Sequence, residues 1–231
     1  MEPIILDNIP FQLDMAALQK RLHIKEGSGH GEELERLAAQ AQAVGKPKAM
    51  YKMAFIEDRG DDYIIVDGVK LTSRVLRVNV EQVHRLFPYV ATCGAELDEW
   101  EKSLDDLLER YWADAIKAMA LNAASRYLDR HMTDQYPLEK SARMNPGSLA
   151  DWPLREQRPL FALLGNPQQA IGVQLTDSFL MIPNKSVSGI RFPTESSFEN
   201  CQLCPRESCP GRRARYDKDL YEKKYKPAGS G

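Results

Sequence analysis

The chain has 231 residues, and its 31 basic and 33 acidic residues give a formal net charge of -2 at pH 7. This length allows one large domain with a hydrophobic core that needs no disulfides. The balanced charge excludes the broad positive field of a nucleic-acid-binding protein. No stretch is apolar for long enough to cross a bilayer, and no basic start precedes an apolar run. We therefore expect a cytoplasmic protein that binds neither nucleic acid nor a membrane.

Two helices are predicted in residues 1–45, which we assign to an N-terminal helical segment. Asp14 can cap a first helix that ends near Leu22. Apolar residues at helical spacing predict a second helix over residues 32–44, and Gly45 is a typical helix stop.

Residues 46–195 are predicted to form the body of the protein. Residues 50–56 and 62–66 are rich in aromatic and β-branched side chains and flank a turn, which indicates a hairpin. The apolar run of residues 85–94 predicts a buried strand, and Pro88 places this strand near a sheet edge.

The longest periodic signal predicts a helix from about Leu104 to His131, and Pro137 prevents its continuation. Pro153 then begins a shorter helix that ends near Leu164. Strands are expected to follow over residues 173–175, 179–182 and 187–192. Because strands and helices do not alternate regularly, we predict an α+β fold with a twisted antiparallel or mixed sheet flanked by long helices.

The stretch of residues 143–191 is too irregular to be explained by packing alone. It contains the segments Arg143-Met-Asn-Pro-Gly147-Ser148, Leu175-Thr-Asp-Ser-Phe179 and Ser186-Val-Ser-Gly189. These segments resemble the activation domain of cobalamin-dependent methionine synthase, which binds S-adenosylmethionine. In that family a loop of Arg, small residues, Pro and Gly is followed by a Leu-Thr-x-Ser-Phe strand and a Ser-Val-Ser-Gly strand.

The resemblance implies a binding site for S-adenosylmethionine. Its residues would be Arg143, Asn145, Pro146, Gly147 and Ser148. The resemblance also places Ser186, Ser188 and Gly189 on a surface that would cover the corrinoid ring of a partner. The chain departs from the family at two points: Ser148 stands where the family has Tyr, and the acidic contact from the long helix falls near Asn122.

The residue types of the loop suit this cosubstrate. Arg143 can hold a carboxylate through two hydrogen bonds, Pro146 fixes the loop, and Gly147 lets the backbone approach a ligand closely. The alternative is a loop that leads into a helix and is stabilised by a buried arginine. Likewise, the alternation of polar and apolar residues from 177 to 188 is also typical of a half-buried strand.

Three of the four cysteines crowd into residues 201–209. Thiolates at this spacing can converge on one metal ion or cluster, and a distant cysteine can complete the set. The predicted ligands are Cys93, Cys201, Cys204 and Cys209. Four thiolates fit an iron-sulfur cluster and zinc equally well, and free or redox-active thiols are the alternative. We assign residues 196–231 to a Cys-rich and charged tail that packs on the body, and we expect its charged run, 216–225, to be solvated.

The resemblance implies a free-standing reactivation protein. It would support reductive methylation of an oxidised corrinoid carried by a separate corrinoid protein, or by a methionine synthase that lacks its own activation domain. One electron from a donor would be coupled to methyl transfer from S-adenosylmethionine. The chain would orient the methyl donor and exclude water, as one component of a cobalamin-dependent methyltransferase system.

A second hypothesis assigns the chain to a different class. It would be an iron-sulfur or zinc-binding electron-transfer or docking partner of a corrinoid methyltransferase, without binding S-adenosylmethionine.

Overall fold

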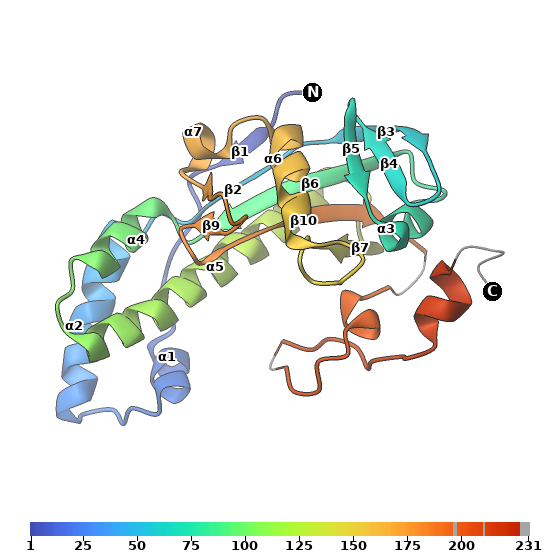
Figure 1. Ribbon diagram of the computed structural model, residues 1–231. Coiled ribbons are helices and arrows are strands. Elements are labelled where there is room, and N and C mark those ends of the chain that lie inside the picture. The colour runs from blue at the N-terminus through green and yellow to red at the C-terminus, as the bar shows by residue number, and fades with distance from the viewer. Residues whose placement is uncertain (196–197, 210, 227–231) are drawn as a thin grey trace.

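The structure, a computed structural model, describes residues 1–195, 198–209 and 211–226. It has the predicted α+β architecture, with helices packed on both faces of an antiparallel sheet (Figure 1). Within the described ranges, no helix is both long and apolar enough to cross a membrane.

Strand β6 (Arg85–Thr92) lies at the centre of the sheet. On one side it pairs with β2 (Lys48–Tyr51) and with β3 (Ala54–Arg59). Beyond them lie β1 (Ile4–Leu6), which pairs with β2, and the meander of β4 (Tyr63–Val66) and β5 (Val69–Thr72). On its other side β6 pairs with β10 (Ser186–Pro193), whose outer neighbour is the edge strand β7 (Ser141–Met144).

Pro88 lies in the middle of this central strand, so the expectation that it marks a sheet edge is wrong. Its carbonyl accepts a hydrogen bond from the Lys52 N–H at 3.1 Å. In an antiparallel strand the N–H and C=O of one residue point to the same side. The missing N–H of Pro88 therefore faces Lys52, the residue that follows β2, and the pairing of β2 with β6 ends there.

Helix α5 (Leu107–Gln135) covers one face of the sheet, where Ala124, Leu128 and Met132 pack against Tyr51 and Phe87. The opposite face is covered by α6 (Gln157–Leu164), which follows the short 3-10 helix η1 (Leu154–Glu156), and by α7 (Pro167–Ile171). Figure 1 shows α5 behind the sheet and α6 in front of it.

The N-terminal helices pack on the first half of α5. Helix α1 (Met15–Leu22) begins after the predicted cap, and Asp14 Oδ1 accepts a hydrogen bond from the Ala17 N–H at 3.0 Å. Helix α2 (Gly29–Val44) begins earlier than predicted because Ser28 caps it. Both helices share a hydrophobic cluster with α4 (Ala95–Lys102) and α5.

Some elements differ from the sequence predictions. Helix α3 (Arg74–Asn79) occupies a segment to which no period could be assigned. The strands β8 (Gln174–Leu175) and β9 (Met181–Ile182) pair with each other in a separate two-stranded ribbon, outside the main sheet.

The tail is less solvated than expected. It contains the 3-10 helix η2 (Asn200–Leu203) and the short π-helix η3 (Tyr221–Tyr225). Tyr225 is fully buried in the same cluster as Trp152 and Leu76, whereas Tyr216 is exposed. The expectation that the run 216–225 is solvated is therefore wrong for Tyr225.

Candidate functional site

The candidate site lies at the edge strand β7, on the face of the sheet that α5 covers. Side chains alternate along β7, so Ala142 and Met144 enter the core on the opposite face. Arg143 then points to the α5 side, where its cross-strand neighbour is Arg191 of β10. The sequence predicted this arginine at the start of a loop, and the structure places it at the end of a strand.

Two arginines face each other across β7 and β10, and Asp129 of α5 balances them. The Asp129 Oδ1 atom lies 2.7 Å from Arg143 Nη2 and 4.0 Å from Arg191 Nη1. Like charges directly opposite each other on a sheet repel. Asp129 therefore stabilises the pair, and the three side chains together carry a net charge of about +1.

The two arginines differ in exposure. Arg191 is buried and donates hydrogen bonds to Ser141 Oγ, Thr133 Oγ1 and the carbonyls of Asp129 and Leu138. Burial, followed by the charge of Arg143, lowers the pKa of Arg191 from its usual value. The Arg143 side chain is 30% exposed. Arg191 is thus a structural arginine, and Arg143 is accessible to a ligand.

Asn145 fastens the predicted loop to the sheet. Its Nδ2 donates to the Tyr89 hydroxyl at 2.9 Å and to the Ser188 carbonyl at 2.7 Å. This contact requires glycine at position 189, because a Cβ there would lie 2.4 Å from Asn145 Nδ2 and 2.6 Å from the Met144 carbonyl oxygen. Asn145 and Gly189 therefore act together to fix where the loop leaves β7.

The loop turns at Gly147 and remains open to solvent. Gly147 has a φ of +85°, a conformation that favours glycine, and its N–H donates to the Trp152 carbonyl at 2.7 Å. Pro146 and Leu149 are buried, whereas Gly147 and Ser148 are exposed. The loop is thus anchored at both ends and accessible at its tip.

Tyr89 lies beneath the charged cluster. Burial raises the pKa of its hydroxyl, while the charge of Arg143 and the hydrogen bond with Asn145 oppose that rise. The charge of Asp129 raises the pKa of this hydroxyl, and that of Arg213 lowers it. Neither Tyr89 nor Asp129 was a predicted site residue. Their contacts cross between elements distant in sequence, although Asp129 could have been noted as an acid on the long helix.

The predicted serines have structural contacts. Ser186 Oγ donates to the Pro183 carbonyl at 2.8 Å and shares a hydrogen bond with Thr92 Oγ1 at 2.9 Å. Ser188 is buried, and its carbonyl is bonded to Asn145. The structure therefore places these serines along β10 beside the loop and shows Ser188 inside the fold.

Cys93 does not lie with the cysteines of the tail. It is buried beside α4 and α5 in the cluster of Leu97 and Ile116, and burial raises the pKa of its thiol to about 12. The tail instead packs on the other cluster, through Leu203. In the described ranges, no three His, Cys, Asp or Glu residues form a group that could hold a metal ion.

The tail cysteines lie in a compact loop around Arg212. This guanidinium donates to the carbonyls of Cys201, Cys204, Arg206 and Ala214. The Arg213 N–H donates to Cys201 Sγ at 3.4 Å, and it is the main reason that the pKa of this thiol is lowered. All three tail cysteines are partly exposed.

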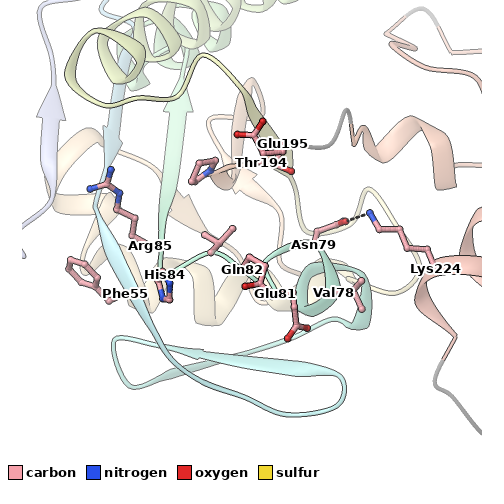
Figure 2. Close-up of a pocket in the computed structure, with 12 residues that line it drawn as sticks. Phe55, Val78, Asn79, Glu81, Gln82, His84, Arg85, Thr194, Glu195 and Lys224 are labelled. Carbon is pink, nitrogen blue, oxygen red and sulfur yellow. Dashed lines mark hydrogen bonds between the residues drawn. The ribbon is translucent and has the colours of Figure 1, made fainter.

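Several cavities lie around this region. A cavity of about 810 Å³ is bounded by β3, β6, α3 and the residues after β10 (Figure 2). Figure 2 shows Lys224 reaching from the tail to Asn79 at its rim, with Nζ 3.0 Å from Oδ1. Neither Arg143 nor Gly147 lines this cavity. The predicted loop is an exposed surface feature and is not a wall of this cavity.

A smaller cavity, of about 260 Å³, separates the continuation of the loop from the tail. Leu149, Ala150 and Asp151 line it on one side, and Leu203 and Tyr221 on the other. A third cavity, of about 400 Å³, lies between α1 and α5 and includes Asn122 in its wall. Asn122 is therefore accessible, two helical turns before Asp129 on α5.

Comparison with known proteins relates the region of this site to one family. The family model described as "Vitamin B12 dependent methionine synthase, activation domain" matches residues 89–202. This range includes α5, the Arg143 loop and β10. No curated protein matches the chain by sequence.

A solved structure shares the fold. It is described as "Crystal Structure of the MetH Reactivation Domain bound to AdoHcy", and the match has a TM-score of 0.57. The two chains are 16% identical, and the match covers 86% of this chain and 81% of that chain. The predicted α+β fold is thereby confirmed.

Proposed function

We propose that this chain binds S-adenosylmethionine at the Arg143 loop, because residues 89–202 match the activation domain of vitamin B12 dependent methionine synthase and the fold is that of a reactivation domain. In this proposal it supports reductive methylation of an oxidised corrinoid that a separate corrinoid protein or methionine synthase carries. The solved relative holds the demethylated product, AdoHcy, which supports a site for this class of ligand.

The observation that carries the proposal is that Arg143 is accessible to a ligand. Its side chain is 30% exposed beside a loop whose tip, Gly147 and Ser148, is open to solvent. Guanidinium is well suited to bind a carboxylate through two parallel hydrogen bonds. The net positive charge of the cluster with Arg191 and Asp129 also favours an anionic group.

The residues of the chain would position the methyl donor. Arg143 would hold the carboxylate, and the exposed backbone of Gly147 and Ser148 would contact the nucleoside. Asn145 would keep this loop at a fixed position through Tyr89 and Ser188. The corrinoid of the partner would accept one electron from a separate donor and the methyl group of S-adenosylmethionine, which leaves as S-adenosylhomocysteine.

Docking of the corrinoid protein is assigned to the surface next to β10. Leu180 and Ile182 of the β8–β9 ribbon are 57% and 42% exposed. Lys185 joins this ribbon to α5 through an ion pair with Asp114 at 2.7 Å. Neighbouring apolar side chains that are exposed on a two-stranded ribbon held in place by an ion pair are suited to contact another protein.

Calorimetric titration with S-adenosylmethionine tests the proposal. We expect the native chain to bind, and Arg143→Ala to lose about tenfold or more in affinity, because one charge-assisted hydrogen bond contributes about 1.5–3 kcal/mol. Arg36→Ala is the matched control, because Arg36 pairs with Glu109 on helices away from the loop. The absence of heat with the native chain would remove the proposed function.

A further inference from the structure

Asp129 is the acidic partner of Arg143 in the part of the chain that the structure describes. Sequence reasoning did not place an acid here, and it left the departure at Asn122 without a replacement. The Asp129 side chain is 31% exposed, close to the 30% exposure of Arg143. The two charges thus lie side by side at the protein surface.

The pair retains unused hydrogen-bonding atoms. Arg143 approaches Asp129 through Nη2, and the contact is made to Oδ1. Arg191 also approaches Oδ1, at 4.0 Å. Within the described ranges, no hydrogen bond joins Oδ2 of Asp129 or the Nε and Nη1 atoms of Arg143 to another residue. One acceptor atom of Asp129 and two donor nitrogens of Arg143 therefore remain for a ligand.

An arginine with a purely structural role is expected to be buried and to have all its nitrogens hydrogen-bonded within the protein, as Arg191 is. Arg191 is 7% exposed, and each of its nitrogens donates to an acceptor of the protein. Arg143 lies directly opposite Arg191 in the sheet but has no such set of acceptors. This contrast indicates that Arg191 holds β10 to its neighbours, whereas Arg143 and Asp129 are available to a ligand.

An α-amino acid group complements an accessible guanidinium that lies beside an accessible carboxylate. Its carboxylate needs the donors of a guanidinium, and its ammonium needs an anionic acceptor. We propose that Asp129 accepts the α-ammonium group of S-adenosylmethionine through Oδ2 while Arg143 holds the carboxylate. This inference rests on the proposed function and adds to it the residue that recognises the amino group.

The inference predicts a specific pattern of affinities. Asp129→Asn keeps the shape of the side chain and removes its charge. We expect it to weaken S-adenosylmethionine binding by about tenfold or more, since hydrogen bonds to charged groups are the stronger class. Binding of 5′-deoxy-5′-methylthioadenosine, which has no amino acid group, should be unchanged. The ratio of the two affinities, measured on one protein sample by calorimetry, does not depend on the fraction that is folded.

Asp134→Asn is the matched control, because Asp134 is an exposed acid on the same helix. It should leave both affinities unchanged. If Asp129→Asn binds S-adenosylmethionine as tightly as the native chain, or more tightly, Asp129 is a counter-ion that the ligand does not use, and the inference fails alone. If the native chain binds no S-adenosylmethionine, the proposed function fails, and the inference fails with it.

Discussion

At the scale of single residues, the fixed position of the loop depends on Gly189. We expect Gly189→Ala to destabilise the fold by about 1–3 kcal/mol, as overpacking of a tight site does. The added Cβ would lie 2.4 Å from Asn145 Nδ2 and 2.9 Å from the Tyr89 hydroxyl, so Asn145 has to move. Urea unfolding measures the stability, and the S-adenosylmethionine titration should show a parallel loss of affinity.

Gly29→Ala is the control for this substitution. No heavy atom outside its own helix lies within 4 Å of a Cβ at position 29, which is the first residue of α2. Its stability should therefore stay close to that of the native chain. Equal stability of Gly189→Ala and the native chain would show that the loop is not held by this contact.

The sequence predicted the candidate site residues that lie together in one segment of the chain. Arg143, Pro146 and Gly147 were predicted from the resemblance of their segment to a family loop. The structure places Arg143 near the end of β7, Pro146 buried after it, and Gly147 at the exposed turn. Asp129 and Tyr89 could not be found in this way. Asp129 reaches Arg143 across helix and sheet, and Tyr89 reads as an ordinary apolar strand residue.

At the scale of elements, α4 and α5 are joined by a buried ion cluster. Lys117 Nζ lies 2.6 Å from Asp98 Oδ1 and also contacts Glu101, while the Lys117 side chain is 1% exposed. We expect Lys117→Met to lose about 3–5 kcal/mol of unfolding free energy at neutral pH, because it leaves a buried carboxylate unpaired. Lys102→Met, which removes an exposed partner of the same Asp98, should change stability little.

This cluster should make stability depend on pH in a defined direction. Burial acts to raise the pKa of Asp98, but hydrogen bonds from Lys117 and Lys102 outweigh it, so the pKa is lowered. The stabilisation is therefore present above the unfolded-state pKa and lost as pH falls through the folded-state value. The gap between the native chain and Lys117→Met should narrow in urea titrations at about pH 3. A constant gap would contradict this account.

Element boundaries were predictable where local signals are strong. The caps at Asp14 and Gly45 and the limit at Pro137 define helices in the structure much as expected. Helix α3 has only six residues, too few to show a period, and its Ser73 cap is the one local signal. Whether the strand of Pro88 lies at the centre or at the edge of the sheet depends on the strands that flank it, and the local sequence does not contain this information.

At the scale of the whole molecule, the fold class followed from the order of elements, whereas the arrangement of the tail did not. Charged residues dominate 216–225, so its composition indicates solvent exposure. One apolar ring in such a run is enough to anchor it. Tyr225 packs edge-on against Phe198, and its hydroxyl donates to Asn79 Oδ1 at 3.0 Å. Pairings of this kind are set by tertiary contacts alone.

The anchoring of the tail can be tested with one substitution. Tyr225→Ala should cost about 3 kcal/mol or more of unfolding free energy, because it removes a fully buried aromatic side chain from the core. It should also accelerate tryptic cleavage at Arg213 and Arg215, since the tail would lose the hydrogen bond of the Tyr225 hydroxyl to Asn79 of α3. Tyr216→Ala, at a position that is 47% exposed, should change stability by about 0.5 kcal/mol or less. If the two variants unfold and are cleaved alike, Tyr225 does not hold the tail on the body of the protein.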